Sequence, residues 1–440
     1  MIDFFFFLFL FVFLIINYRI TKKKKLSDNL SNPLLLFGVF FFLIHLLLPY
    51  LQWKNNMFRY KSSYDIEVYI YSVFYTFLGY ILCFISFHLN LNKEKNILKE
   101  NDGLDNRFIL SKKLIKIIFR INLIVYFIAL YFAYKVFSQI SLIGQEDYLR
   151  DRIGLGVGSG FSMLLPHWQY INCLIFFILF SLTRENYKLY NKLSIVFFLI
   201  SFLSISVYYS TNSNRNSIFI LLLNILIIYF VIQKVKIKKL SFKSLIIIIV
   251  SILIALFSFY EIGKARHGDY YSDKDYTLLN NLNGAFGNHE NIVWLIQEKN
   301  DVFFYGETYL AGFANFIPRN IWKDKPLGAG PKMKNFINPG SYVVGKKGNT
   351  SLTTGFFNEL YMNFGVIGIL LGGWFFGFLL KYLFIKLKNA NSIIDVFLIQ
   401  YILIVLASQF VYSEFLGFLA RLLITIIPIL LIKFYIKKKK

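Results

Sequence analysis

Long apolar runs separated by short charged segments dominate the chain. We predict about eleven such runs, most of them about 18–22 residues long, which is the length that an α-helix needs to cross the hydrocarbon core of a membrane. The predicted spans are residues 2–20, 33–53, 66–90, 114–137, 164–182, 193–210, 217–233, 243–261, 356–385, 393–411 and 415–436. Since helices satisfy their own backbone hydrogen bonds, the pattern predicts an all-α polytopic membrane protein rather than a β-barrel, which would show short alternating segments.

Composition supports this class. Hydrophobic residues make up 57% of the 440 residues and charged residues only 16%, and the mean hydropathy is +0.55. The net charge of +24 raises the possibility of a nucleic-acid partner, but the Lys and Arg residues lie in clusters between spans, so we predict no such partner. Cys83 and Cys173 each lie inside an apolar run and do not form a pattern typical of a disulfide or a metal site.

The basic clusters predict the orientation of the chain. One set of connections is rich in Lys and Arg: Lys22–Lys25, 93–116, 184–192, 234–243, 381–388 and Lys437–Lys440. The positive-inside rule makes this set cytoplasmic, so we predict a cytoplasmic C-terminus. The first apolar run precedes its positive charges, which is the reverse of a secretory signal. It therefore predicts an anchor with the N-terminus outside.

Residues 262–355 interrupt the series of predicted spans. They are rich in Gly, Pro and charged residues, yet they keep aromatic side chains such as Trp294 and Trp322. We predict a folded extracytoplasmic loop within a single integral membrane domain, residues 1–440. Residues 288–299 are predicted to form a short amphipathic helix on the membrane surface.

Several cofactor classes have no support in the sequence. There is no P-loop, and the glycine-rich run Gly154–Gly160 does not fit a dinucleotide fingerprint and is interpreted as a flexible loop. None of the five histidines belongs to a metal-binding motif. Asp273-Lys-Asp275 has the D-x-D form used by sugar transferases to hold a metal, but such short matches are common by chance. We predict no metal and no cofactor.

Arginines in the predicted outer segments are the first candidates for chemistry. These are Arg150, Arg152, Arg215, Arg266 and Arg319. The positive-inside rule disfavours Arg on this side. Each could simply contact lipid phosphate, but several of them around one cavity would form an anion site, because guanidinium groups match phosphate oxygens.

The start of the ninth predicted span is the second candidate. Glu359 lies in the segment Gly355–Gly365, at or just inside the outer membrane boundary. An ionisable residue there suggests function, although an acid near a helix N-terminus is also favoured by the helix dipole. Beyond it, the G-x-x-x-G spacings Gly368/Gly372 and Gly373/Gly377 predict close helix packing.

Together these features resemble the Wzy-type oligosaccharide repeat-unit polymerases, which make O-antigens and capsules. The resemblance rests on the architecture of nearly the whole chain, on P-R-x-x-W-x-x-K-P at 318–326, and on G-x-x-x-E-x-Y-x-N-F-G at 355–365. Arg319 and Gly330 also fit the R-x10-G pattern of the family's outer loops, whereas Arg150 and Arg152 do not complete it in the second outer loop. Arg215 is placed like the Arg of a related S-R-G signature, with Asn216 in place of Gly.

The resemblance implies a GT-C-like fold in a bacterial cytoplasmic membrane. It implies that an acceptor hydroxyl attacks the anomeric carbon of a chain carried on undecaprenyl diphosphate, without metal or nucleotide. It also implies membrane lipid, a flippase and a chain-length regulator as partners. The expected catalytic residues are Arg215, Arg266 and Arg319 for the leaving diphosphate, and Glu359, Glu261 or His289 for the proton; the expected substrate-binding residues are Arg150, Arg152, Trp322, Lys325 and Tyr361.

Three other functions stay open at this point. An O-antigen ligase has the same layout, and in that case His267 or His289 would matter more. A flippase or transporter of lipid-linked sugars usually has two similar halves, which are absent from this sequence. A non-catalytic membrane subunit would not need the outer arginines.

Overall fold

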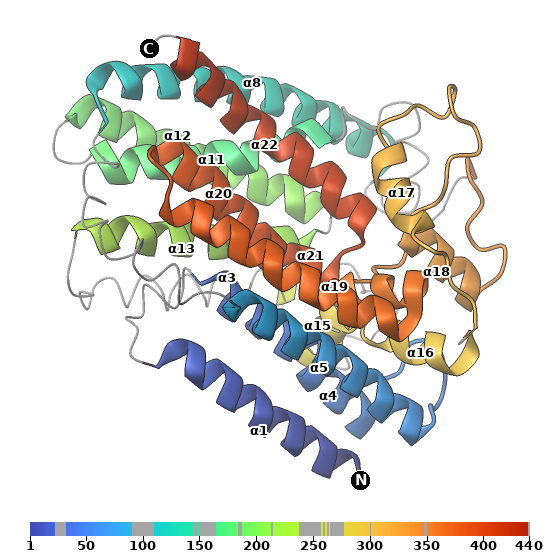
Figure 1. Cartoon of the computed structure of the whole chain (residues 1–440). Coiled ribbons are helices and arrows are strands. Elements are labelled where there is room, and N and C mark those ends of the chain that lie inside the picture. The colour runs from blue at the N-terminus through green and yellow to red at the C-terminus, as the bar shows by residue number, and fades with distance from the viewer. Residues whose placement is uncertain are drawn as a thin grey trace.

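The computed structural model describes residues 1–22, 32–89, 110–144, 148, 164–183, 187–212, 214–236, 257, 260–261, 264, 277–299, 301–346 and 350–438. These residues form helices and the segments between them, with no β-strand in the described ranges. The long helices run side by side in one bundle, and the two chain termini lie at opposite ends of it (Figure 1).

Nine apolar helical segments in the described part of the chain are long enough to cross a membrane. They are α1 (Ile2–Thr21); α3 (Pro33–Phe41), η1 (Phe42–Leu47) and α4 (Leu48–Lys54) together; α5 (Ile66–His88); α8 (Lys112–Ile143); η2 (Leu165–His167) with α11 (Trp168–Thr183); α12 (Lys188–Thr211); α19 (Phe356–Lys388); α20 (Ile393–Ala407) with α21 (Gln409–Tyr412); and α22 (Phe415–Lys438). The predicted all-α polytopic membrane fold is confirmed.

Two of the predicted spans remain outside this set. The run 217–233 lies in α13 (Arg215–Lys236), whose apolar part, Asn216–Phe230, is shorter than the nine. The run 243–261 lies almost entirely outside the described residues.

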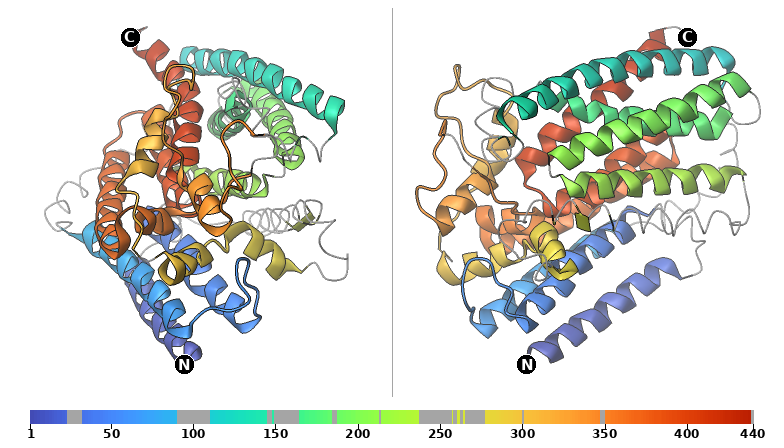
Figure 2. Two further views of the ribbon diagram at one scale, coloured as in Figure 1. Left: turned by 90° about the vertical axis from the view of Figure 1, so that its right-hand side faces the viewer. Right: turned by 180° about the vertical axis from the view of Figure 1, so that it is seen from behind.

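Four shorter helices follow α13 in the chain. They are α15 (Leu278–Phe286), α16 (Glu290–Glu298), α17 (Glu307–Ala314) and α18 (Ala329–Ile337). They gather at the end of the bundle where the N-terminus lies, which we call the loop end (Figure 2). Side-chain amides fasten them to the spans: Asn288 Nδ2 donates to the Tyr412 carbonyl at 2.9 Å, and Asn291 Nδ2 donates to the Thr353 carbonyl at 2.9 Å.

Helix α16 differs from the prediction for residues 288–299. The helix is present, but it does not lie on a surface. Consecutive residues on all of its faces are buried, from Glu290 to Leu295, because α16 packs against both α5 and α19. Its buried polar residues have protein partners: Glu290, for example, accepts a hydrogen bond from the Arg59 amide at 2.7 Å.

The predicted close packing at the glycines of α19 is present against α5. A Cβ atom on Gly373 or Gly377 would collide with the main chain of Gly79 or Cys83, respectively. The two helices can approach only because these positions lack side chains.

Helix α19 changes direction at Gly365, where φ is +62° and ψ is −149°. The ring centroids of Phe356 and Phe376 lie only 4.8 Å apart, whereas twenty residues of continuous helix would separate them by about 30 Å. Residues 356–364 therefore fold back along residues 366–388. The predicted span 356–385 is thus a short helix, a reversal and a long helix rather than one straight helix.

Candidate functional site

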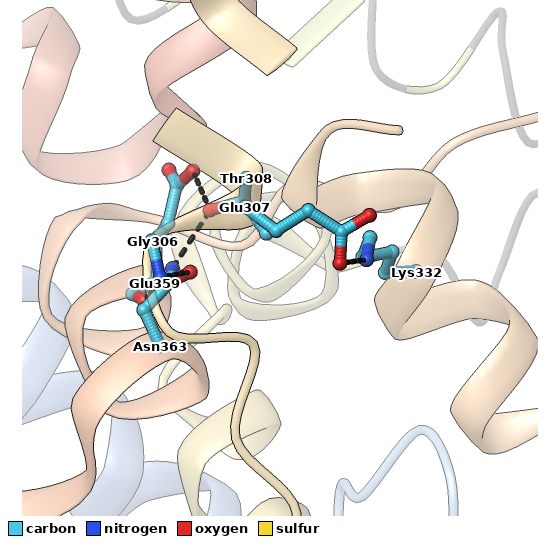
Figure 3. Close-up of polar contacts among 6 residues, drawn as sticks. All are labelled: Gly306, Glu307, Thr308, Lys332, Glu359 and Asn363. Atoms are coloured by element: carbon cyan, nitrogen blue, oxygen red, sulfur yellow. Dashed lines mark hydrogen bonds and ion pairs between the residues drawn. The ribbon is translucent and has the colours of Figure 1, made fainter. Parts of the chain in front are cut away.

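The candidate site lies at the loop end, where residues 356–364 meet α17 and the start of α22. Glu359 is at its centre and is 1% exposed. Its Oε1 accepts a hydrogen bond from Thr308 Oγ1 at 2.7 Å, and its Oε2 accepts one from the Phe415 amide at 2.6 Å. Asn363 Nδ2 also donates to Thr308 Oγ1, at 2.7 Å, and Figure 3 shows these side chains pointing toward one another.

A second set of contacts supports the chain reversal at Gly365. The last carbonyls of the short helix 356–364 have no partner within the helix, as at the end of every helix. The amides of Phe304 and Tyr305 donate to the carbonyls of Met362 and Asn363 at 3.0 Å each. The reversal is therefore hydrogen-bonded to the segment before α17.

These contacts favour a positioning role for Glu359. A buried carboxylate is tolerated only when it is hydrogen-bonded, and both oxygens of Glu359 are used to join α17, α19 and α22. The sequence placed this acid at the outer boundary of a span but did not indicate that both oxygens have protein donors.

Glu414 is a second carboxyl group at this site, and sequence reasoning missed it. It lies between α21 and α22, and its Oε2 accepts a hydrogen bond from the Gly330 amide at 2.6 Å. It is close enough to Glu359 to act on it electrostatically. Burial raises the pKa of Glu414 to about 7, and the hydrogen bond from Gly330 opposes this rise. The signal in the sequence was a lone acid between two apolar runs, which suggests function at a membrane boundary.

The P-R-x-x-W-x-x-K-P segment folds back on itself beside this site. Arg319 Nη1 donates to the Lys323 carbonyl at 3.0 Å, and Lys325 Nζ donates to the Ile317 carbonyl at 2.9 Å. Lys325 also reaches the carbonyls of Ala314 and Asn315, at 3.4 Å each, where α17 ends. Its cation thus caps the negative end of that helix.

Arg319 has more unused hydrogen-bond donors than Lys325. Both hydrogen bonds that Arg319 makes with described residues use the single Nη1 nitrogen. Burial and the neighbouring charge of Arg319 lower the pKa of Lys325. Of the two cations, Arg319 is the better placed to meet a substrate anion.

The two predicted aromatic contacts have different environments. Trp322 is 36% exposed, so its ring is available to a ligand. Tyr361 is 3% exposed and packs edge-to-face with Phe303 at 6.2 Å. Tyr361 therefore stabilises the short helix rather than facing a sugar.

His289 belongs to a buried chain of polar groups with His45 and Ser72. Its Nδ1 lies 2.8 Å from Nδ1 of His45, and its Nε2 lies 3.0 Å from Ser72 Oγ. Burial lowers the pKa of His289 to about 3, so the ring is neutral near pH 7. These contacts join η1, α5 and α16, which favours a structural role.

The remaining predicted arginines are placed only in part. Arg150, Arg152 and Arg266 lie outside the described residues, as does His267. Arg215 is the first residue of α13, and its side chain is not among those described. The candidate base Glu261 is an exposed helical residue.

Arg421, which was not predicted, lies beside the start of α13. It is on the second turn of α22, and its Nη1 donates to Ser217 Oγ at 3.0 Å. Within the described ranges no carboxylate forms an ion pair with Arg421. The side chains of Tyr209, Tyr401 and Tyr412 lie within its electrostatic range. A lone Arg within an apolar run is a functional signal that the sequence already contained.

Among the residues that the structure describes, no three of His, Cys, Asp and Glu lie close enough together to hold a metal ion. Cys83 and Cys173 are buried and unpaired.

Comparison with known proteins gives one result for the whole chain. No curated protein and no solved structure matches it significantly. The family model described as O-antigen polysaccharide polymerase Wzy matches residues 1–440. The chain therefore belongs to the Wzy family of O-antigen polysaccharide polymerases.

Proposed function

We propose that this protein joins oligosaccharide repeat units carried on undecaprenyl diphosphate, at the outer face of the bacterial cytoplasmic membrane. Membership of the Wzy family supports polymerisation of lipid-linked repeat units in a membrane. In the proposed reaction a hydroxyl of the incoming unit attacks the anomeric carbon of the growing chain, and undecaprenyl diphosphate leaves. The lipid diphosphate already activates the sugar, so we propose that neither a metal nor a nucleotide takes part.

The proposed orientation places the loop end outside. Met1 and helices α16–α18 lie at the loop end, and the C-terminus lies at the other (Figure 1). Helices α19 and α22 finish with lysines, Lys386 and Lys388 in one and Lys437 and Lys438 in the other. Such lysine-rich ends are typical of the cytoplasmic side.

The position of Arg421 is the main structural support for the proposed chemistry. A departing lipid diphosphate gains negative charge, so the reaction needs fixed cations near it. Arg421 is half-buried in a span near the loop end, bonded to a neutral hydroxyl and free of acidic partners among the described residues. Its charge is available to a phosphate. Arg319, Arg215 and Arg266 remain proposed members of the same cation set.

The other proposed partners follow from this role. Membrane lipid surrounds the apolar spans, a flippase supplies the lipid-linked units, and a chain-length regulator acts on the product. Arg150, Arg152 and Trp322 remain proposed contacts to the oligosaccharide.

Deletion of the gene followed by glycan analysis tests the function. We expect glycans capped with a single repeat unit, and restoration of the long ladder by the wild-type gene. Accumulation of full-length lipid-linked polymer would instead indicate a ligase.

Complementation with Arg421→Ala tests the proposed role of Arg421. We expect no ladder, and a weak ladder from Arg421→Lys, which keeps the charge but not the fork of donors. Lys433→Ala is the matched control, since it removes a cation of the same helix that is paired with Asp395. A full ladder from Arg421→Ala would remove this residue from the mechanism.

A further inference from the structure

Glu414 has the geometry of a reactive carboxyl group, and none of the functions above uses it. Among the described residues its one hydrogen-bond partner is the amide of Gly330, which donates to Oε2. Its Oε1 accepts no hydrogen bond from any residue in the described part of the chain. Glu359, in contrast, has a protein donor on each oxygen.

Glycines form the wall around this carboxyl group. A Cβ atom on Gly328 would lie 3.0 Å from Glu414 Oε2, and one on Gly330 would lie 3.1 Å from it. A Cβ on Gly417 would lie 3.9 Å from Oε1. Side chains at the first two positions would press on Oε2, so the two glycines allow the backbone to approach this oxygen closely. The close packing also gives a physical reason for Gly330 in the R-x10-G pattern: a Cβ there would collide with the Leu352 carbonyl oxygen and with Ser351 Oγ, so a larger residue could not bring its amide this close to Glu414 without displacing them.

The same pattern brings a cation close to a phenol that neighbours Glu414. Tyr342 is within the electrostatic range of both Arg319 and Glu414. Glu359 faces Glu414 from α19. Among the described residues, Glu359 and Tyr342 therefore lie within electrostatic range of Glu414, and Arg319 lies within range of Tyr342.

We infer that Glu414 is the general base that accepts the proton of the attacking sugar hydroxyl. This inference rests on the proposed polymerase function. The hydroxyl oxygen forms a bond to the anomeric carbon while its proton passes to Glu414 Oε1. The bond from the anomeric carbon to the diphosphate oxygen breaks, and its electron pair leaves with undecaprenyl diphosphate. The carboxylate becomes neutral and the leaving diphosphate gains one negative charge, so charge balances.

The proton affinity of Glu414 suits this role. A base works best when its pKa is near the working pH, and burial raises the pKa of Glu414 to about 7. His289 is hydrogen-bonded on both ring nitrogens and has a pKa of about 3, so it is a poor proton acceptor at neutral pH.

The test is polymerisation of purified lipid-linked repeat units by the full-length protein in detergent. Glu414→Gln keeps an oxygen that can accept from the Gly330 amide but cannot take up the proton. We expect its turnover to fall about 10²- to 10⁴-fold with little change in KM. Glu307→Gln is the matched control, because Glu307 is an exposed acid at the loop end paired with Lys332 at 2.5 Å. It should keep wild-type turnover.

The pH dependence of the wild-type enzyme gives a second reading that needs no variant. Its rate should fall about tenfold per pH unit below pH 7 and level off above it, and Glu414→Gln should lose this dependence. A rate flat between pH 6 and 8, or a folded Glu414→Gln enzyme with wild-type turnover, overturns the role of Glu414 alone. Failure of the wild-type protein to polymerise any lipid-linked unit overturns the proposed function as well.

Discussion

The Nδ1 atoms of His45 and His289 lie 2.8 Å apart in the interior of the protein. One ring must donate and the other accept, so the pair is stable only while the acceptor nitrogen stays unprotonated. His289 also contacts Ser72 Oγ, whereas Nε2 of His45 is buried and has no hydrogen-bond partner among the described residues. These contacts fix α16 between η1 and α5.

Acid should therefore destabilise this region. The pKa of His289 is about 3 in the folded protein and about 6.5 in an unfolded chain, so the unfolded state binds the proton more tightly. Stability is complete above pH 6.5 and falls as the pH drops toward 3. Between pH 7.5 and 5.5 we expect a loss of about 1.4 kcal/mol, measured as a lower midpoint of thermal unfolding in detergent. His289→Asn should remove only the part of the loss that comes from His289, because the second buried ring, His45, stays in place, while His88→Asn should keep the whole loss. An unchanged midpoint in the wild-type protein would contradict the prediction.

Arg319 should be essential for polymer formation. Arg319→Ala removes a guanidinium near Tyr342 and should abolish the long-chain ladder in complemented cells, while the protein still accumulates in the membrane. Lys323→Ala, which removes an exposed cation from the same segment, is the control and should give a normal ladder. A normal ladder from Arg319→Ala would exclude Arg319 from the site.

Gly365→Ala should destabilise the chain reversal in α19. The backbone there has φ +62° and ψ −149°, a region that costs a side-chain-bearing residue about 1–3 kcal/mol. The new Cβ would also lie 3.0 Å from Phe303 Cζ. We expect a lower unfolding midpoint and reduced polymer. At Gly340, with φ +76°, a Cβ meets nothing within 4 Å, so Gly340→Ala should have the smaller effect. Equal changes in the unfolding midpoint would mean that the Phe303 side chain can move aside without a loss of stability.

Two adjacent glycines should respond differently to the same substitution. Gly373→Ala directs its Cβ at the main chain of Gly79 and should separate α5 from α19. For Gly372→Ala the three nearest atoms all belong to the side chain of Leu360, which can rotate. We expect Gly373→Ala to lower the unfolding midpoint by several degrees, and Gly372→Ala to stay close to the wild type. The reverse order would show that the helices are not held at this contact.

Single cysteines should reveal the orientation of the bundle. Asn338 and Asn389 are exposed residues that follow the ends of α18 and α19. In intact cells or spheroplasts, a membrane-impermeant maleimide should label Asn338→Cys directly and Asn389→Cys only after permeabilisation. Background should be low because Cys83 and Cys173 are buried. Labelling in the opposite pattern would reverse the proposed topology.

The candidate site contains contacts that the sequence alone could not predict. The segments around Arg319 and Glu359 were identified because they carry short motifs near the membrane boundary. The partner of Glu359, the Phe415 amide, is 56 residues away, and Gly330 is 84 residues from Glu414. No local pattern encodes such a pairing, so Glu414 was not singled out despite its place between two apolar runs.

The sequence by itself determined the membrane class, most of the helices and the segment that carries the motifs. It could do so because hydrophobicity and helix length are properties of consecutive residues, and a membrane selects on both. Only the tertiary structure decided that α16 is buried, that α19 reverses at Gly365, and that Arg421 lies beside Ser217. Each of these features depends on where distant segments of the chain meet. The pattern of hydrophobicity along the chain does not specify where a side chain points or which partner a polar group finds.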